Sequence, residues 1–386
     1  GLVYDAAVDA AYVTANPTTS VRDAAGRGFR RAPGVAGEFN VQLYGAKGDN
    51  GANDTAAIQA AFTAALASGG ASRVVFPRGT YRCGLVTFTG ATDLVIEGFG
   101  AKLVPLAQDA RTFYAESVTN LTIKGLQFVQ TAGFSYNPTI RIINGTNVVI
   151  EENIFTNCGF GADIFGVTGV LYRANKLTQI GIYPRPSPLD PTGAGYSAGF
   201  DVYGTGLRAN SCNNVVFADN LFKNTNPASG NTSDQTGGAG AFISFYSDNV
   251  TFRDNTSINS PGQGCVAVGV HQGTNVVALT IAGTLNVSGL GKNIRFIGGY
   301  SEGSNQEGFT AYGCGNVQFI GVEGKNNRFA SIEAWQSFNV SIIGCISEEG
   351  AMLIPGQSAN GGVGAIHIVG VFNCQVSDLK INSARG

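Results

Sequence analysis

The stretch Asn316-Val317-Gln318-Phe319 is one copy of a short phrase, an Asn followed by apolar and often β-branched residues, that decides the fold. Full copies begin at Asn120, Asn147, Asn214, Asn249, Asn293, Asn316 and Asn339, and looser copies begin at Asp93, Gly169 and Asn373. The apolar anchor after this residue falls at positions 94, 121, 148, 170, 215, 250, 294, 317, 340 and 374. A recurring unit of this length, with occasional longer insertions, is typical of a solenoid in which each coil stacks on its neighbours.

The composition of the repeats indicates which solenoid to expect. They are rich in Val, Ile, Phe, Thr and Asn, the chain holds 55 Gly, and no 3.6-residue apolar period is sustained. Short strands broken by turns are therefore favoured over helical repeats. We predict an all-β, single-stranded right-handed parallel β-helix of about 10–12 coils, with the Asn side chains stacked from coil to coil. The alternative is a β-sandwich with Asn-rich turns, but sandwiches do not hold so long a period.

Charge and cysteine content exclude several classes of function. The 24 Lys and Arg nearly balance the 26 Asp and Glu, and no basic stripe suited to nucleic acid is present. No apolar run approaches the length of a membrane span. Seven Cys at wide spacing form neither a disulfide framework nor a zinc site, so we expect no metal and no cofactor.

The chain divides into three predicted segments. Residues 1–37 lack the repeat and are expected to be a neck or attachment segment. Residues 38–84 are expected to form a capping module of strand, helix and strand, in which Asp54 caps the helix and Ile58, Phe62 and Leu66 form its apolar stripe. Residues 85–386 carry the repeat. A helix ahead of the first coil would cover its open edge.

Residues 38–84 also carry a resemblance. Tyr-Gly-Ala-Lys-Gly-Asp at 44–49, Asn-Asp-Thr-Ala-Ala-Ile-Gln-Ala-Ala at 53–61 and Phe-Pro-Arg-Gly-Thr-Tyr at 76–81 resemble the opening of the pectate-lyase-like superfamily. In particular they resemble the β-helix domains of bacteriophage tailspikes and polysaccharide depolymerases. The resemblance implies a virion tail protein, usually a homotrimer, that binds and cleaves bacterial surface polysaccharide. The Asp-Pro-His signature of alginate epimerases is missing, so no carboxylate receives a role by motif.

Alternation within a strand locates a candidate groove. Residues eight and six before the anchor are expected to face inward, and those seven and five before it outward. One outward row then reads Tyr114, Arg141, Asp163, Asp201, near Ser244, Thr310, Glu333 and His367. The neighbouring row reads Glu116, Ile143, Phe165, Tyr203, near Tyr246, Tyr312, Trp335 and Val369. Ionisable groups beside a line of aromatics predict a sugar-binding surface, although aromatic ladders that only stabilise a solvated face are the alternative.

Long insertions add candidates beside this surface. The segment 181–198 offers Tyr183, Arg185 and Tyr196, and the segment 225–240 offers Asp234. Loops of this length on a rigid scaffold often carry function. The predicted acid and base residues are Asp163, Asp201, Asp234 and Glu333, with Glu307 as a further loop carboxylate. The predicted sugar-binding residues are Arg141, Phe165, Tyr183, Arg185, Tyr196, Tyr203, Tyr246, Tyr312 and Trp335.

The predicted function is an endo-glycosidase of the tailspike type that acts on capsule, O-antigen or exopolysaccharide. A polysaccharide lyase for a uronic-acid glycan and a non-catalytic receptor-binding β-helix are the alternatives. A secreted bacterial enzyme is the alternative to a virion protein. His271 and His367 are expected to be ordinary surface residues.

Overall fold

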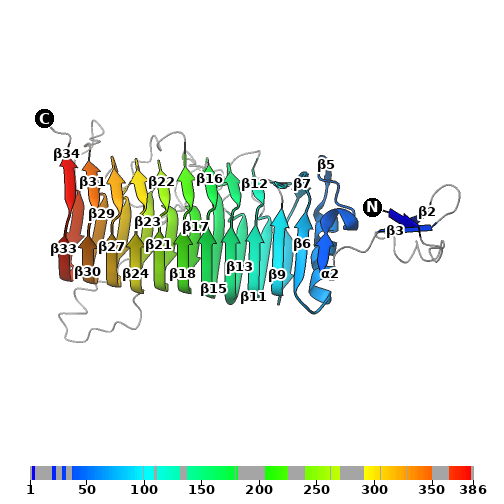
Figure 1. The fold of residues 1–386 in the computed structure, drawn as a ribbon, viewed down its shortest axis with the longest axis horizontal. Helices are drawn as coiled ribbons and strands as arrows, with labels where there is room; N and C mark the ends of the chain where they lie inside the picture. The colour runs from blue at the N-terminus through cyan, green and yellow to red at the C-terminus, as the bar shows by residue number, and fades with distance from the viewer. Residues whose placement is uncertain are drawn as a thin grey trace, which may run out of the picture.

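The computed structural model describes most of the chain. The described residues are 37–98, 100–107, 111–130, 137–178, 180, 205–224, 240–260, 262–269, 291–304, 306–327, 329–349 and 365–383, and three N-terminal strands. From helix α2 to strand β34 they form one elongated stack of coils (Figure 1). All strand pairs within the stack are parallel and join successive coils, as β13 with β15 does. The predicted parallel β-helix is confirmed.

Each coil contributes to three sheets. Sheet 1 contains β8 (Val86–Thr89), β17 (Thr205–Asn210), β20 (Gly240–Phe245), β23 (Gln263–Val268), β26 (Phe309–Tyr312), β29 (Ile332–Trp335) and β32 (Ile366–Val369). Sheet 2 contains β4 (Glu38–Asn40), β6 (Ser72–Phe76), β9 (Thr92–Gly98), β18 (Asn213–Ala218), β21 (Asp248–Arg253), β24 (Lys292–Ile297), β27 (Gly315–Ile320), β30 (Phe338–Ile343) and β33 (Phe372–Ser377). Three long strands run through both sheets: β11 (Phe113–Lys124), β13 (Ile140–Glu151) and β15 (Phe160–Arg173).

Sheet 3 has twelve strands. They are β5 (Asp49–Asn53), β7 (Thr80–Cys83), β10 (Lys102–Pro105), β12 (Gln127–Val129), β14 (Ile154–Thr156), β16 (Lys176–Thr178), β19 (Leu221–Lys223), β22 (Thr256–Ile258), β25 (Tyr300–Glu302), β28 (Glu323–Lys325), β31 (Ile346–Glu349) and β34 (Lys380–Ser383). Near the N-terminus, β1 (Leu2–Tyr4), β3 (Gly28–Arg31) and β2 (Ser20–Arg22) form a separate antiparallel sheet.

The repeated Asn makes the turn between sheet 1 and sheet 2. Asn147, Asn316 and Asn339 have φ values of 54°, 53° and 50°, in the left-handed region that Asn tolerates better than most residues. The side-chain amide of Asn339 donates to the amide oxygen of Asn316 at 3.0 Å, which continues a ladder along the stack. Gly169 replaces the Asn in one coil at φ 79°, where a Cβ would lie 2.8 Å from Oδ1 of Asn147. The predicted Asn stacking is confirmed.

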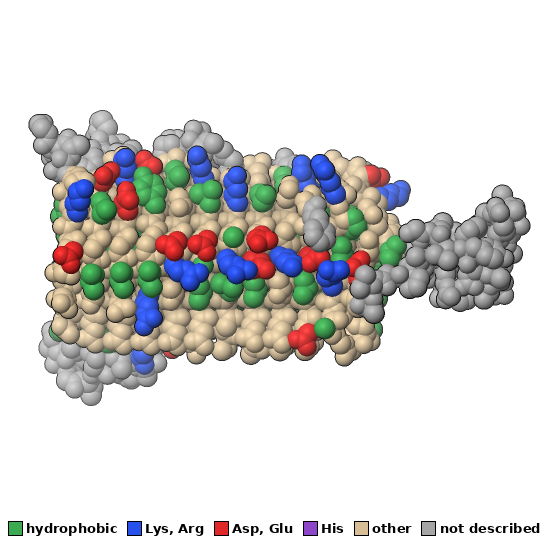
Figure 2. Space-filling model, in the orientation of Figure 1, with side chains coloured by type: hydrophobic (Ala, Val, Ile, Leu, Met, Phe, Trp, Pro, Cys, Tyr) green, Lys and Arg blue, Asp and Glu red, His purple; other side chains and the backbone are tan. Residues whose placement is uncertain are grey.

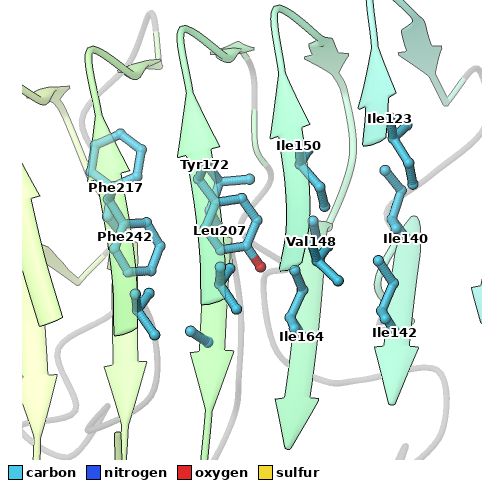
Figure 3. Packing of buried hydrophobic residues seen from close by; sticks show 14 of the residues in the cluster. Ile123, Ile140, Ile142, Val148, Ile150, Ile164, Tyr172, Leu207, Phe217 and Phe242 are labelled. Carbon is cyan, nitrogen blue, oxygen red and sulfur yellow. The ribbon is translucent and has the colours of Figure 1, made fainter. Parts of the chain in front are cut away.

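Inward residues of the sheets fill the core in rows. Figure 3 shows Ile140, Ile142, Ile164, Leu207 and Phe242 of sheet 1 and Ile123, Val148, Ile150, Tyr172 and Phe217 of sheet 2. Along sheet 2 the rings stack from coil to coil, with centroids 4.8 Å apart between Phe217 and Phe252 and between Phe252 and Phe296. Stacked aromatic pairs stabilise beyond the burial of their area. The core therefore repeats with the coils, which fixes the register of the outer face.

Helix α2 (Thr55–Ala67) begins at the predicted position and packs over the first coil. Ile58 and Phe62 are buried and Leu66 is partly buried, as the apolar stripe predicted. Asp54 occupies the N-cap position but makes no cap hydrogen bond. Its carboxylate instead accepts from the backbone N–H groups of Lys47 at 2.7 Å and Gly48 at 3.2 Å. Strands β4 and β5 pair with β6 and β7, so residues 38–84 share sheets with the coils that follow.

The outer face of sheet 2 carries a line of alternating charges (Figure 2). Arg73 contacts Glu38 and Glu97, and Lys124 contacts Glu97. The Arg73 and Lys124 side chains are exposed, whereas Glu97, which both contact, is buried. After Arg253 the same row continues as Ile297, Ile320 and Ile343, so the charges end in the middle of the stack, and the candidate site lies on sheet 1. No helix among the described residues has the length and apolarity of a membrane span.

Candidate functional site

The strand register of sheet 1 gives the composition of two outward rows directly. The outer row is Thr87, Tyr114, Arg141, Asp163, Arg208, Ile243, Val266, Thr310, Glu333 and His367. The adjacent row is Thr89, Glu116, Ile143, Phe165, Asn210, Phe245, Val268, Tyr312, Trp335 and Val369. The inward residues between them, such as Ile142, Ile164 and Ala334, are buried, which confirms the predicted parity.

The register corrects the middle of both predicted rows. Arg208 pairs with Asp163, at the position predicted for Asp201, and Asn210 stands where Tyr203 was predicted. In the next coil the two outward positions hold Ile243 and Phe245, while Ser244 faces inward and is buried. Asp201 fits the row only if a longer turn precedes anchor 215 than precedes the other anchors. Strict counting, seven residues back from that anchor, gives Arg208.

Several predicted residues do not enter the described site. Asp201, Tyr203, Tyr183, Arg185, Tyr196 and Asp234 lie outside the described residues, so they remain predictions. Tyr246 is described and partly buried, and it lies in the turn after β20 at φ 49°. It therefore stands one residue beyond the outward position that was predicted for it.

Asp163 lies between two guanidinium groups. Its Oδ1 accepts from Nε of Arg208 at 2.8 Å and its Oδ2 from Nη2 of Arg208 at 3.0 Å. Nη1 of Arg141, on the preceding coil, is 3.1 Å from the same Oδ2. Asp163 is only 1% exposed, and both of its oxygens are engaged. This arrangement suits a carboxylate that orients two arginines, and it does not suit an acid or base that must reach a substrate.

A second cluster, centred on Glu333 four coils beyond Arg208, joins carboxyls instead of arginines. Glu333 of β29 and Glu307, in the turn before β26, are 6% and 8% exposed. Oε1 of Glu333 lies 2.8 Å from Nδ1 of His367 on the next coil. The Gln263 side chain hydrogen-bonds Glu307. Two carboxyls, an imidazole and an amide therefore meet on four successive coils of sheet 1.

Burial perturbs both carboxyls in this cluster. Desolvation, and then the negative charge of Glu333, raise the pKa of Glu307 to about 8. Desolvation raises the pKa of Glu333 to about 7. Two neighbouring buried carboxyls cannot easily both ionise, so near neutral pH the pair holds about one proton. Sites of acid–base catalysis commonly separate a protonated from an ionised carboxyl in this way.

Aromatic rings border the acid pair on the adjacent row. The rings of Tyr312 and Trp335 lie 5.9 Å apart, and those of Trp335 and His367 lie 6.1 Å apart. Trp335 is among the exposed large apolar residues, as is Phe165 near Asp163. Within the described part of the chain, Thr310 Oγ1 and Gln306 Oε1 are buried without a hydrogen-bond partner. The cluster thus offers an apolar face and free polar atoms beside two titratable carboxyls.

The sequence predicted some of this cluster and missed the rest. Glu333, Tyr312 and Trp335 were predicted at this face, and the structure brings them together. The pairing of Glu307 with Glu333 was not predicted, and His367 proves to be bonded to Glu333. Glu307 lies in the turn before β26, outside the alternation of the strand, so the sequence carries no parity signal that its carboxyl lies near Glu333.

Comparisons with known proteins agree with the fold. The family described as "Right handed beta helix region" matches residues 109–281. The A-module of mannuronan C-5 epimerase AlgE6 from Azotobacter vinelandii is similar in structure, with a TM-score of 0.55 and 15% identity over 90% of this chain and 100% of that chain. PfbA, a surface adhesin of Streptococcus pneumoniae, has a TM-score of 0.51 and 14% identity over 89% and 91% of the two chains. The Dettilon tailspike protein has a TM-score of 0.51 and 12% identity over 91% and 63%.

In sequence, the mannuronan C5-epimerase AlgE2 of Azotobacter vinelandii is 35% identical in an alignment of 105 residues that covers 23% of this chain and 10% of the relative. The chain spans a tenth or less of the length of the curated relatives that it matches. These likenesses show a right-handed parallel β-helix. What the chain does has to be argued from its own side chains.

Proposed function

We propose that this β-helix is a polysaccharide-cleaving enzyme in which Glu307 and Glu333 supply acid–base catalysis. The observation that carries the proposal is the buried carboxyl pair on sheet 1, with both pKa values raised toward neutrality and aromatic rings alongside. Glycoside hydrolysis requires one protonated carboxyl, which protonates the leaving oxygen. It also requires one ionised carboxylate, which attacks the anomeric carbon or activates the attacking water. An endo-glycosidase therefore fits this pair best.

The different pKa values of the two carboxyls assign them different catalytic roles. Glu307 has the higher pKa and is assigned as the general acid. Glu333 ionises first and contacts His367, so it is assigned as the nucleophile or base. Trp335 and Tyr312 would stack on sugar rings beside the pair.

Glutamine variants test this assignment. Glu307→Gln and Glu333→Gln each keep the side-chain shape and remove the ability to exchange a proton, so each is expected to reduce release of reducing ends by at least about 100-fold. Asp219→Asn is the matched control, because Asp219 is an exposed carboxylate in the turn after β18, far from the pair. Folded variants of both glutamates that cleave at the wild-type rate would exclude the assignment.

A polysaccharide lyase or epimerase for a uronic-acid glycan is the second candidate. The similarity to mannuronan epimerases favours it, and the same two carboxyls with His367 would then exchange a proton beside the sugar carboxylate. Products identify the chemistry: hydrolysis gives saturated ends, elimination gives an unsaturated sugar that absorbs ultraviolet light, and epimerisation leaves chain length unchanged. Binding of a glycan with none of these products would favour the adhesin alternative, for which the similarity to PfbA stands.

The same proposal includes the kind of protein to which the enzyme belongs, a bacteriophage tailspike. The resemblance of residues 38–84 and the tailspike among the similar structures support a surface or virion protein that binds bacterial capsule, O-antigen or exopolysaccharide. A homotrimer is the assembly that this setting implies. Sedimentation equilibrium of the full chain tests it directly, and a monomer at micromolar concentration would argue against the tailspike assignment.

A further inference from the structure

The cluster of Arg141, Asp163 and Arg208 is left unused by the acid pair. It lies in the same outer row, and four coils separate Arg208 from Glu333. At about 4.8 Å per coil, the two centres are about 19 Å apart along the stack. A side-chain cluster at this distance cannot assist proton transfer at Glu307, so its presence requires another explanation.

The fold itself does not require charge at these positions. The next two positions of the same row hold Ile243 and Val266, both buried. Burying a carboxylate between two guanidiniums costs desolvation energy, and apolar residues of similar volume are often at least as stabilising. The row therefore holds charged residues at Arg141, Asp163 and Arg208, although apolar residues occupy the same row in the next two coils.

The triad is also built to present the arginines in fixed positions. Asp163 holds Arg208 through two parallel hydrogen bonds, and the guanidinium lies 4.7 Å above the ring of Phe160. The Tyr172 hydroxyl donates to the backbone oxygen of Arg208 at 2.6 Å. Asp163 leaves Nη1 of Arg208 and Nε and Nη2 of Arg141 for other acceptors, and these side chains are 16% and 28% exposed. A preorganised pair of guanidiniums is suited to bidentate recognition of an anion.

The charge balance of the row points the same way. Arg111 lies with its guanidinium 5.7 Å from the ring centre of Tyr114, one coil before Arg141. Asp163 offsets one positive charge and Glu116 another, so this end of the row keeps a net positive charge. At the other end, the ionisable groups of the cluster are the carboxyls of Glu307 and Glu333 and the imidazole of His367. The row is therefore polarised from a basic to an acidic end.

We propose that Arg141 and Arg208, oriented by Asp163, form an anion subsite for an acidic substituent of the polysaccharide. The inference rests on the proposed function for the identity of the ligand as a glycan. The substituent would be a carboxylate or a sulfate ester, because both offer the paired oxygens that guanidiniums bind. A ligand that occupies both this subsite and the acid pair spans about 20 Å or more, so short acidic oligosaccharides would engage only one of them.

Binding of three oligosaccharides of equal length tests the subsite: an oligouronate, a sulfated oligosaccharide and a neutral glucan. Isothermal titration calorimetry on the full chain is expected to show that an acidic probe binds and that added salt weakens its binding. Arg141→Gln leaves the Asp163–Arg208 pair intact and is expected to weaken acidic binding about tenfold or more, without change for the neutral probe. The two acidic probes distinguish carboxylate from sulfate recognition.

A double variant, Asp163→Ile with Arg208→Val, places at these positions the residue types that Ile243 and Val266 provide in the next two coils. The fold accommodates such residues there, so the variant is not expected to misfold. It is expected to fold and to lose the preference for acidic probes. Equal affinity of wild type for acidic and neutral probes, or unchanged acidic binding in the folded double variant, would overturn the subsite. Acidic binding without cleavage would sustain the subsite while the proposed activity fails. Cleavage without any acidic preference would do the reverse.

Discussion

Replacing Glu307 by Gln should change how the stability of the protein depends on pH. Burial and the charge of Glu333 raise the pKa of Glu307 from its ordinary 4.5 to about 8. Between these values the folded protein keeps a proton that the unfolded chain releases, so the free energy of unfolding falls as pH rises. Each pH unit in the interval costs about 1.4 kcal/mol, which gives an upper limit of about 5 kcal/mol between pH 4.5 and 8.

The sign of this effect follows from the raised pKa. The contribution of the neutral carboxyl is fully present below pH 4.5 and is lost as pH approaches 8, where the folded protein must ionise a buried group. Gln cannot ionise, so the variant should lose less stability over this interval than wild type. Glu333 titrates in the same interval and supplies the slope that remains, since its pKa is also raised.

Urea unfolding of both proteins at pH 5, 6, 7, 8 and 9 measures the difference. The wild-type midpoint should fall relative to that of Glu307→Gln by an amount equivalent to several kcal/mol between the extremes, and the gap should stop widening above about pH 8. Groups that do not interact with Glu307 act equally in both proteins and cancel in the comparison, whereas Glu333 ionises more easily in the variant because the Glu307 charge is gone. Parallel pH profiles for the two proteins would refute the environment assigned to Glu307.

The remaining predictions concern the stacked Phe rings of the core, the Asn residues of the turns and Trp335 beside the carboxyl pair. Phe296→Ala removes a ring stacked on Phe252 and Phe319, and should lower the free energy of unfolding by about 3–5 kcal/mol in urea titrations; a loss below 1 kcal/mol would contradict the ring-stack account. Asn316→Ala should cost about 1–2 kcal/mol because Ala disfavours φ 53°, whereas Asn316→Gly should cost less in the same assay, and the reverse order would exclude this explanation. Trp335→Ala should weaken glycan binding about 2- to 10-fold by calorimetry with stability little changed, and unchanged affinity would remove Trp335 from the site.

The sequence predicted the architecture well because Asn marks most of the coils, with Asp93 and Gly169 in its place in two of them. Asn accepts the left-handed turn that joins sheet 1 to sheet 2, so its recurrence counts coils and sets parity at once. That parity placed Arg141, Asp163 and Glu333 on the outer row correctly. The predicted rows were wrong in the two middle coils, where the strands are Thr205–Asn210 and Gly240–Phe245 and the outward positions are Arg208, Asn210, Ile243 and Phe245.

The chemistry of the row was less predictable, because it depends on contacts between coils. Nothing in the sequence near Asp163 reveals that Arg208 lies beside it with 44 residues between them, so the ion pair could not be predicted in advance. Glu307 lies at a corner between sheets, where alternation no longer tells whether a side chain turns inward. Its raised pKa follows from burial and from Glu333, both of which require the folded register.

The pH–rate profile of polysaccharide cleavage tests the central assignment most directly. Glu333 must be ionised and Glu307 protonated, so kcat/KM for wild type should follow a bell with its maximum between about pH 7 and 8. Glu307→Gln should remove the alkaline limb along with most of the activity. A profile that is flat from pH 5 to 9, or a bell that Glu307→Gln leaves unchanged, would contradict an acid pair at this site.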